Sequence, residues 1–169
     1  MRKPFTSILL KALIIILIAL IFGLVSNYFS PHRINLIGNW SKKVFSDSLI
    51  VPYSYGKGDP PAITLSEAMT KYQSPQVIFL DARLEGDYKA GHIKNALNLP
   101  YEELGNFWDK VALQLSPDKE IVTYCDGTEC ENSLFLAREL KQKGFTKVFI
   151  FFGGWSEWKK AELPIEKSE

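Results

Sequence analysis

The segment at residues 121–133, IVTYCDGTECENS, constrains the fold of this chain more than any other. Its β-branched and aromatic start predicts a strand that ends at Cys125, and the turn-forming run that begins at Asp126 breaks this strand. Apolar residues at helical spacing follow from Leu134, so a helix is expected to begin near Ser133. We therefore expect the Cys125 thiol to be presented by a loop and not buried. Backbone N–H groups of the loop and of the helix N-terminus are expected to point toward the sulfur and lower its pKa.

Short apolar strands alternate with helical segments through the second half of the chain. Thr64, with Glu67 three residues later, forms a capping-box pattern that predicts a helix start. The apolar run Val77–Asp81 is typical of a buried parallel strand. Alternation of this kind predicts an α/β domain, a parallel sheet with helices on both faces. The other expected elements are a strand at 96–100, a helix at 102–115, a helix at 133–143 closed by Gly144, a strand at 147–152 and a last helix that carries Trp155 and Trp158.

The N-terminal segment is apolar from Ala12 to Val25. Counted from Ile8, with Lys11 reaching back to the headgroups, it gives about 18 residues, near the minimum that spans a hydrocarbon core of roughly 30 Å. No polar face interrupts it, which disfavours a buried core helix. Counted from beyond Lys11 it is short enough for a cleaved signal peptide, but no clear small-residue cleavage pair follows it. We expect one uncleaved transmembrane helix.

Basic residues predict the orientation of this helix. Three precede or enter the span and three lie farther beyond it: Arg2, Lys3 and Lys11 against Arg33, Lys42 and Lys43. This bias favours a cytoplasmic N-terminus and an exported domain. In a bacterium the protein would be a single-pass protein of the inner membrane, with its domain in the periplasm or outside the cell, where disulfides persist.

We expect three parts along the chain: a membrane anchor at 1–27, a juxtamembrane linker at 28–61 that partly packs on the domain, and the α/β domain at 62–166. Within the linker, Trp40 can lie at the membrane interface or in ordinary packing. The net charge of the 169-residue chain is +1, so no basic excess points to nucleic acid.

Three motifs, in this order, resemble the rhodanese family: DARLEGDYKAGHIKNALNLP at 81–100, YCDGTEC at 124–130 and FFGGWSEWKKAELP at 151–164. The resemblance covers roughly three fifths of the chain, and three ordered motifs are far more specific than one. It implies a rhodanese-like parallel sheet with the active cysteine at a strand end. It also implies a sulfurtransferase that carries sulfane sulfur as a persulfide on Cys125, without a metal or an organic cofactor. The implied partners are a sulfur donor and a thiol acceptor, each a small molecule or a protein.

The loop departs from the family pattern in its charge. Typical active loops run from the cysteine to an arginine and then a serine, whereas here Asn132 precedes Ser133 and the next cation is Arg138. The loop carries three acids instead: Asp126, Glu129 and Glu131. Each exposed carboxylate opposes a dianion by about 1 kcal/mol, so thiosulfate is expected to be a poor donor. The missing arginine also argues against a cysteine phosphatase, which needs a cation for the phosphoryl oxygens.

Two further motif residues are expected to be structural. His92 lies in Gly91-His92-Ile93, which matches the family's GHI turn, so the resemblance implies a role in the fold rather than a general base. The family pattern also implies that Asp81 and Arg83 pair within the domain, with a supporting place for Arg83 at the site mouth as the alternative. Trp155 and Trp158 are expected in core and rim packing.

Cys130 is the second of only two cysteines, and its role is open between a small loop residue and a resolving thiol for Cys125. The pair lacks the spacing of a zinc site, so no metal is expected. Besides a sulfurtransferase, two functions remain: a non-catalytic module that binds a partner protein at the membrane, and a thiol-disulfide redox protein. The expected site consists of Cys125, Cys130 and the loop residues Asp126, Gly127, Thr128, Glu129, Glu131, Asn132 and Ser133.

Overall fold

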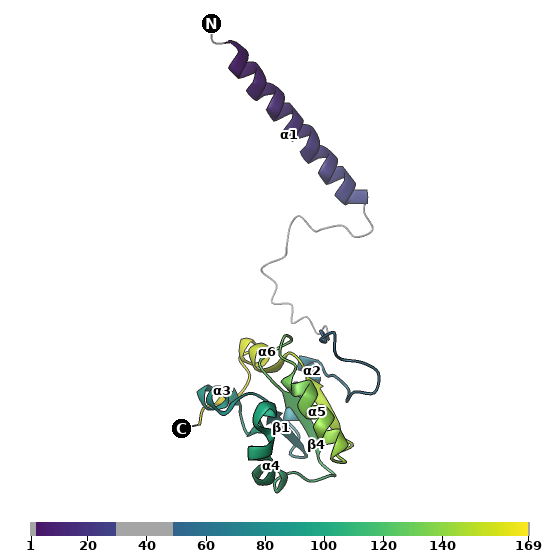
Figure 1. Ribbon diagram of the computed structural model, residues 1–169, viewed down its shortest axis with the longest axis vertical. Coiled ribbons are helices and arrows are strands. Elements are labelled where there is room, and N and C mark those ends of the chain that lie inside the picture. The colour runs from purple at the N-terminus through teal and green to yellow at the C-terminus, as the bar shows by residue number, and fades with distance from the viewer. Residues whose placement is uncertain (1–2, 30–48, 169) are drawn as a thin grey trace. The chain divides into compact units, whose positions relative to one another are not determined.

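The computed structural model describes residues 3–29 and 49–168. The chain divides into two compact units, Met1–Phe45 and Ser46–Glu169. The first contains one helix, α1, among its described residues, and the second contains the α/β domain (Figure 1).

Helix α1, Lys3–Phe29, is made almost wholly of apolar residues. Its segment Leu10–Phe29 is 20 residues long, is not buried, and is the one segment of the described residues with the length and composition to cross a membrane. A signal sequence near an N-terminus has the same two properties. The helix runs two residues past the expected end of the anchor at 27. Five residues used in the sequence argument lie outside the described residues: Arg2, Arg33, Trp40, Lys42 and Lys43.

Four parallel strands form the central sheet, in the order β3-β1-β4-β5. Their bounds are β1 Val77–Asp81, β3 Leu97–Asn98, β4 Glu120–Tyr124 and β5 Val148–Phe151. The register aligns Asp81 with Tyr124 and Tyr124 with Phe151. Strand β4 is therefore hydrogen-bonded on both edges, and the strands on either side of it end level with it, just before Cys125.

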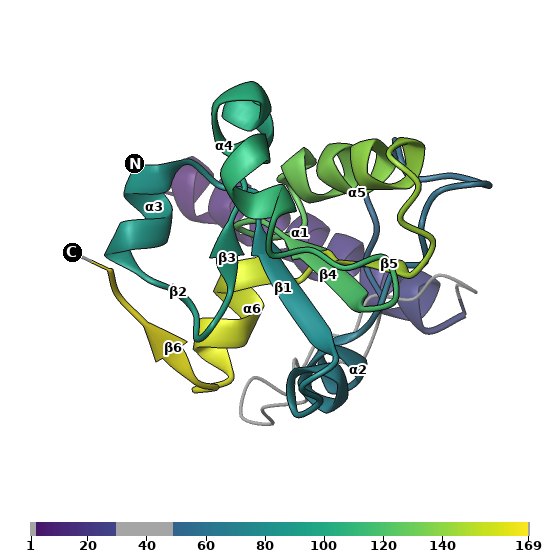
Figure 2. The ribbon, with the colours of Figure 1, turned by 90° about the horizontal axis from the view of Figure 1, so that it is seen from below.

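Side chains along β4 alternate between two cores. Ile121 and Cys125 belong to the core under α4 and α5, whereas Val122 and Tyr124 belong to the core under α2 and α6. The bounds of these helices are α2 Leu65–Tyr72, α4 Leu104–Ala112, α5 Asn132–Gln142 and α6 Gly154–Lys160. Figure 2 shows the two helix pairs on opposite faces of the sheet. The expected parallel sheet with helices on both faces is confirmed.

Several expected element boundaries are also confirmed. Thr64 and Glu67 form the complete capping box at the start of α2. Gly144, with φ +93°, follows α5 in the left-handed conformation that glycine adopts easily.

The helix expected at 102–115 is instead a 3-10 turn, η1 Tyr101–Glu103, followed by α4, which ends at Ala112. After Ala112 the chain continues in tight turns, in which Gln114 and Leu115 donate backbone hydrogen bonds to Val111 and Ala112.

Three small elements were not expected from the sequence. Helix α3, Glu85–Ala90, is six residues long and buries none of them. Strands β2, His92–Ile93, and β6, Ile165–Glu166, pair as an antiparallel ladder separate from the central sheet.

The segment at 52–61, which we call the strap, packs on the α/β domain. Arg138 of α5 donates from Nε and Nη2 to Asp59 over 2.7 and 2.8 Å, and from Nη2 to the Ser54 carbonyl over 2.8 Å. The Tyr55 ring meets Phe152 edge to face, and Pro61 accepts a backbone hydrogen bond from Ile150. These contacts hold the strap, which lies within the segment expected to be a linker, against the domain.

Candidate active site

Cys125 directly follows the central strand β4 and is 0% exposed. The expectation that its thiol is presented to solvent is therefore wrong for this state. The physical reason is the alternation along β4, which continues one residue past the strand and directs Cys125 into the α5 side of the core, beside Leu134 and Leu136.

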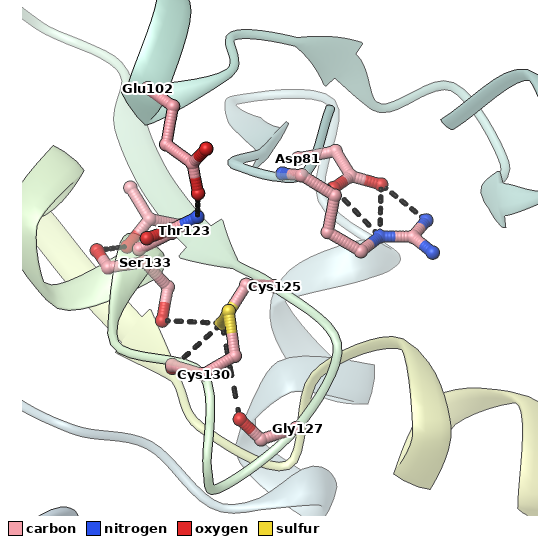
Figure 3. The surroundings of a disulfide bond; sticks show 9 residues. Asp81, Glu102, Thr123, Cys125, Gly127, Cys130 and Ser133 are labelled. Atoms are coloured by element: carbon pink, nitrogen blue, oxygen red, sulfur yellow. Dashed lines mark hydrogen bonds and ion pairs between the residues drawn. A yellow bond between two sulfur atoms is a disulfide. The ribbon is translucent and has the colours of Figure 1, made fainter. Parts of the chain in front are cut away.

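Cys125 is joined to Cys130 in a disulfide, with 6.2 Å between their Cα atoms. Figure 3 shows the bond at the centre of the loop, with the Ser133 side chain pointing toward it from the start of α5. The Cys125 Sγ lies 2.8 Å from the Cys130 carbonyl oxygen, 3.4 Å from the Ser133 Oγ and 3.9 Å from the Gly127 carbonyl oxygen. Cys130 itself is only half-buried.

The expected cradle of backbone N–H groups around the sulfur is not formed in this state. Within residues 49–168, no hydrogen bond runs from a backbone N–H to the Cys125 Sγ, whose neighbours are two carbonyl oxygens and one hydroxyl. The disulfide explains the difference, because it brings the Cys130 carbonyl against the sulfur. A disulfide sulfur has no proton to donate, so the Ser133 hydroxyl is the donor in their contact.

The start of the loop is fixed by the N-terminus of α6. Trp155 and Ser156 donate backbone hydrogen bonds of 2.8 Å to the carbonyls of Cys125 and Asp126. Gly154 allows this close approach: its φ is +57°, and a Cβ there would stand 2.3 Å from the Cys125 carbonyl oxygen. The second glycine of the GG pair in the third motif is therefore required for the contact between α6 and the loop.

The end of the loop is fixed from three other elements. Thr123 of β4 donates to the Ser133 carbonyl over 2.9 Å, and Asn132 donates to the Glu102 carboxylate over 3.1 Å (Figure 3). Glu131 accepts a hydrogen bond from the Ser54 hydroxyl of the strap. This last contact could not be predicted from the sequence, because its partners are 77 residues apart.

Charge at the loop is negative, as expected from the sequence. Asp126 and Glu129 are exposed, and Glu131 is half-buried. Arg138 is engaged by Asp59, whose hydrogen bond raises the arginine's pKa. Burial lowers the pKa of Arg83, but its hydrogen bond and ion pair with Asp81 outweigh this effect, so the net shift is upward.

The residues assigned to the fold lie where that role requires. Arg83 donates to both carboxylate oxygens of the fully buried Asp81 and, over 2.7 Å, to the Gly91 carbonyl. The two ring nitrogens of His92 face the Tyr88 carbonyl and the Glu166 carboxylate, so neither faces the loop. Trp158 is fully buried. The part of the chain that the structure describes contains no group of three or more histidine, cysteine, aspartate or glutamate residues that could hold a metal.

The chain is similar to several known proteins over this domain. A solved structure, the BH2092 protein from Bacillus halodurans, is 30% identical, with a TM-score of 0.52, over 61% of this chain and 72% of that one. The HTH-type transcriptional regulator Rv0324 of Mycobacterium tuberculosis is 34% identical over 106 residues, which are 63% of this chain and 45% of that protein. The tRNA uridine(34) hydroxylase of Escherichia coli is 29% identical over 130 residues, 73% of this chain and 36% of the enzyme. The chain thus spans less than half the length of these two curated relatives, which have different activities.

The family profile described as a rhodanese-like domain matches residues 64–161, more than half of the chain. This range includes the central sheet, the disulfide loop and Gly154, which lies against the loop. The chain belongs to the rhodanese-like domain family.

Proposed function

We propose that this protein is a membrane-anchored sulfurtransferase that carries sulfane sulfur on Cys125. The observation that carries the proposal is the place of Cys125: it follows the central strand of a rhodanese-like domain, inside a loop held at both ends. Rhodanese-like domains transfer sulfur between donors and acceptors.

The chemistry begins from the reduced loop. The Cys125 thiolate attacks the outer sulfur of a sulfane donor, the S–S bond of the donor breaks, and its electron pair leaves with the remainder of the donor. An acceptor thiolate then attacks the outer sulfur of the Cys125 persulfide, and Cys125 departs as a thiolate. Ser133 is placed to donate a hydrogen bond to that thiolate, because its buried hydroxyl already contacts the sulfur.

The proposed location is a bacterial inner membrane, with the N-terminus inside and the domain in the periplasm or outside the cell. The length and composition of α1 support the anchor, and the basic residues before it support the orientation. A disulfide between the chain's two cysteines fits an oxidising compartment.

Mass spectrometry of the fully reduced protein after treatment with inorganic polysulfide tests the function. One added sulfur atom is expected on Cys125, and it should be lost again when a thiol acceptor is supplied. Cys125→Ser is expected to load no sulfur. The matched variant Cys130→Ser keeps the nucleophile and is expected to load it. Equal loading of both variants would contradict the assignment of Cys125.

The disulfide favours a second candidate, a thiol-disulfide redox protein that uses Cys125 and Cys130. In that case, the reduced protein would pass its electrons to a disulfide substrate and would hold no sulfur after polysulfide treatment. If it showed neither reaction, the remaining candidate would be a module that binds a partner protein at the membrane.

A further inference from the structure

The two cysteines of the disulfide differ in exposure. Cys125 is 0% exposed and belongs to the core under α5. Cys130 packs against the same core but is only half-buried, and it follows the exposed Glu129. A thiolate that opens a disulfide must reach one sulfur along the line of the bond that breaks, so access decides which sulfur is attacked.

We propose that an external thiol opens this disulfide at Cys130, so that Cys125 is the sulfur released as a thiolate when the Cys125–Cys130 bond breaks. This inference rests on the proposed function, because it makes a thiol reductant the activator of the sulfur-carrying site. In this proposal Cys130 is the residue that the reductant attacks first.

Packing around Cys125 disfavours the opposite order. Its sulfur is covered by the Cys130 carbonyl oxygen at 2.8 Å and by the Ser133 hydroxyl at 3.4 Å. Leu134 and Leu136 of α5 lie in the same buried cluster. At Cys125 an attacking thiolate meets a fully buried residue, whereas at Cys130 it meets a partly exposed one.

The surroundings of Cys125 also suit a leaving group. A thiol with a lower pKa leaves faster in disulfide exchange, and a hydrogen bond to a thiolate lowers its pKa. Ser133 is fully buried, its carbonyl is held by Thr123 over 2.9 Å, and its hydroxyl contacts the Cys125 sulfur. The hydroxyl is therefore in place before the bond breaks.

The reductant is a dithiol, either a small molecule or a protein. Its first thiolate attacks the Cys130 sulfur, the Cys125–Cys130 bond breaks, and the electron pair leaves on Cys125. Its second thiolate then attacks the reductant's own sulfur in the mixed disulfide, and Cys130 leaves as a thiolate. In total, two electrons pass from the dithiol to the loop disulfide, and the dithiol itself becomes a disulfide. The two protons of the dithiol are released to solvent or taken up by the loop thiols.

A trapping experiment on the full oxidised chain in detergent tests this order of attack. Glutathione is added, the reaction is stopped within its early phase by N-ethylmaleimide, and the protein is cut by a glutamate-specific protease. Cleavage after Glu129 separates the two cysteines. Glutathione is expected on Cys130 and N-ethylmaleimide on Cys125. Glutathione on Cys125, an even distribution, or failure of the oxidised protein to contain this disulfide would overturn the proposal.

A second measurement does not depend on the native disulfide. Cys125→Ser and Cys130→Ser are each labelled with Ellman's reagent, so that the remaining cysteine carries thionitrobenzoate. Release of the dye by glutathione should be on the order of tenfold faster from Cys130 than from Cys125, because thiol exchange depends on access. Equal rates, or the reverse order, would contradict the inference.

The proposed function and the proposed order of attack can be contradicted independently of each other. If Cys130 is attacked first but the reduced protein never loads sulfur on Cys125, the order of attack stands and the sulfurtransferase does not. If sulfur loads on Cys125 but glutathione is found there in the trapping experiment, the function stands and the entry point is wrong.

Discussion

Cys125, which is proposed as the nucleophile, is also part of the core. The sequence marked the strand end and the following turn, but it did not show which face of β4 the next side chain would take. The signal that could have shown it is the two-residue alternation: Ile121, Thr123 and Cys125 share a face, and α5 must cover it. The exposed thiol that the strand, loop and helix pattern predicts is therefore not found in the disulfide-bonded structure.

Acidic side chains near the loop lead to a prediction about substrate charge. Asp126 and Glu129 are exposed, so Asp126→Asn with Glu129→Gln should leave the fold intact and lower the KM for thiosulfate by up to a few-fold for each charge removed, about 1 kcal/mol or less per charge. The effect should shrink at high salt, because exposed charges are screened. Steady-state kinetics at two ionic strengths measures it. A KM that stays the same in both salts would mean that these carboxylates do not face the donor.

The glycine before Trp155 gives a prediction with a matched control. Gly154→Ala forces a side chain into φ +57° and against the Cys125 carbonyl oxygen, so it should cost about 2 kcal/mol or more in unfolding free energy and alter the reactivity of Cys125. Gly144→Ala has φ +93° but nothing within 4 Å of the new Cβ. It should destabilise the protein through backbone strain alone and leave thiol reactivity unchanged. Urea unfolding and alkylation rates of the reduced proteins measure the two effects, and equal reactivity in both variants would contradict the role of Gly154.

At the scale of elements, the strap is the part of the expected linker that binds α5. Its main polar anchor is the ion pair between Asp59 and Arg138, whose side chain is 35% exposed. The Arg138 hydrogen bond holds the pKa of Asp59 below its ordinary value, despite the opposing effect of burial. A carboxyl group with a lowered folded-state pKa adds stability that is fully present above its unfolded pKa, about 3.9, and that is lost as the pH falls through the folded value.

Asp59→Asn should therefore lower the free energy of unfolding by up to about 1 kcal/mol at neutral pH. The difference from the parent should vanish at pH values below the folded pKa, because the parent has then lost the same charge. Urea titrations across acidic pH, with Arg138→Gln and the double variant as a cycle, check this. A difference that persists unchanged at low pH would show that the ion pair is not its cause.

Elements with strong local patterns could be predicted from the sequence, and those made by distant contacts could not. Thr64 with Glu67, the apolar run of β1 and the Gly144 stop each encode a local conformation. Helix α3 buries no residue, so its sequence has no apolar pattern that predicts it. Strand β2 pairs with β6, which lies far from it in the sequence. Within the site, the sequence marked Cys125, Cys130 and the acids. The support from Ser54 and Gly154 depends on chain segments that meet only in the folded domain.

At the scale of the whole molecule, the anchor proposal gives a prediction about topology. A reporter enzyme fused after Glu169 should be active if it is of a kind that functions only outside the cytoplasm, and inactive if it functions only inside. The protein should also stay with membranes after a high-salt wash. Changing Arg2 and Lys3 to glutamate should increase the fraction in the opposite orientation. Detection of a soluble product that begins near Ser26 or Asn27 would show a cleaved signal peptide instead.

The position of β4 between β1 and β5 also determines how the molecule opens. Amides in a strand paired on both edges exchange with deuterium only in the rarest, most global fluctuations, whereas amides of an outer loop exchange in frequent local ones. Residues 126–131 should therefore label early and 121–124 last. Cys125 lies at the boundary between these two regions, so we expect its reaction rate to follow the rate at which the loop opens while the sheet remains folded.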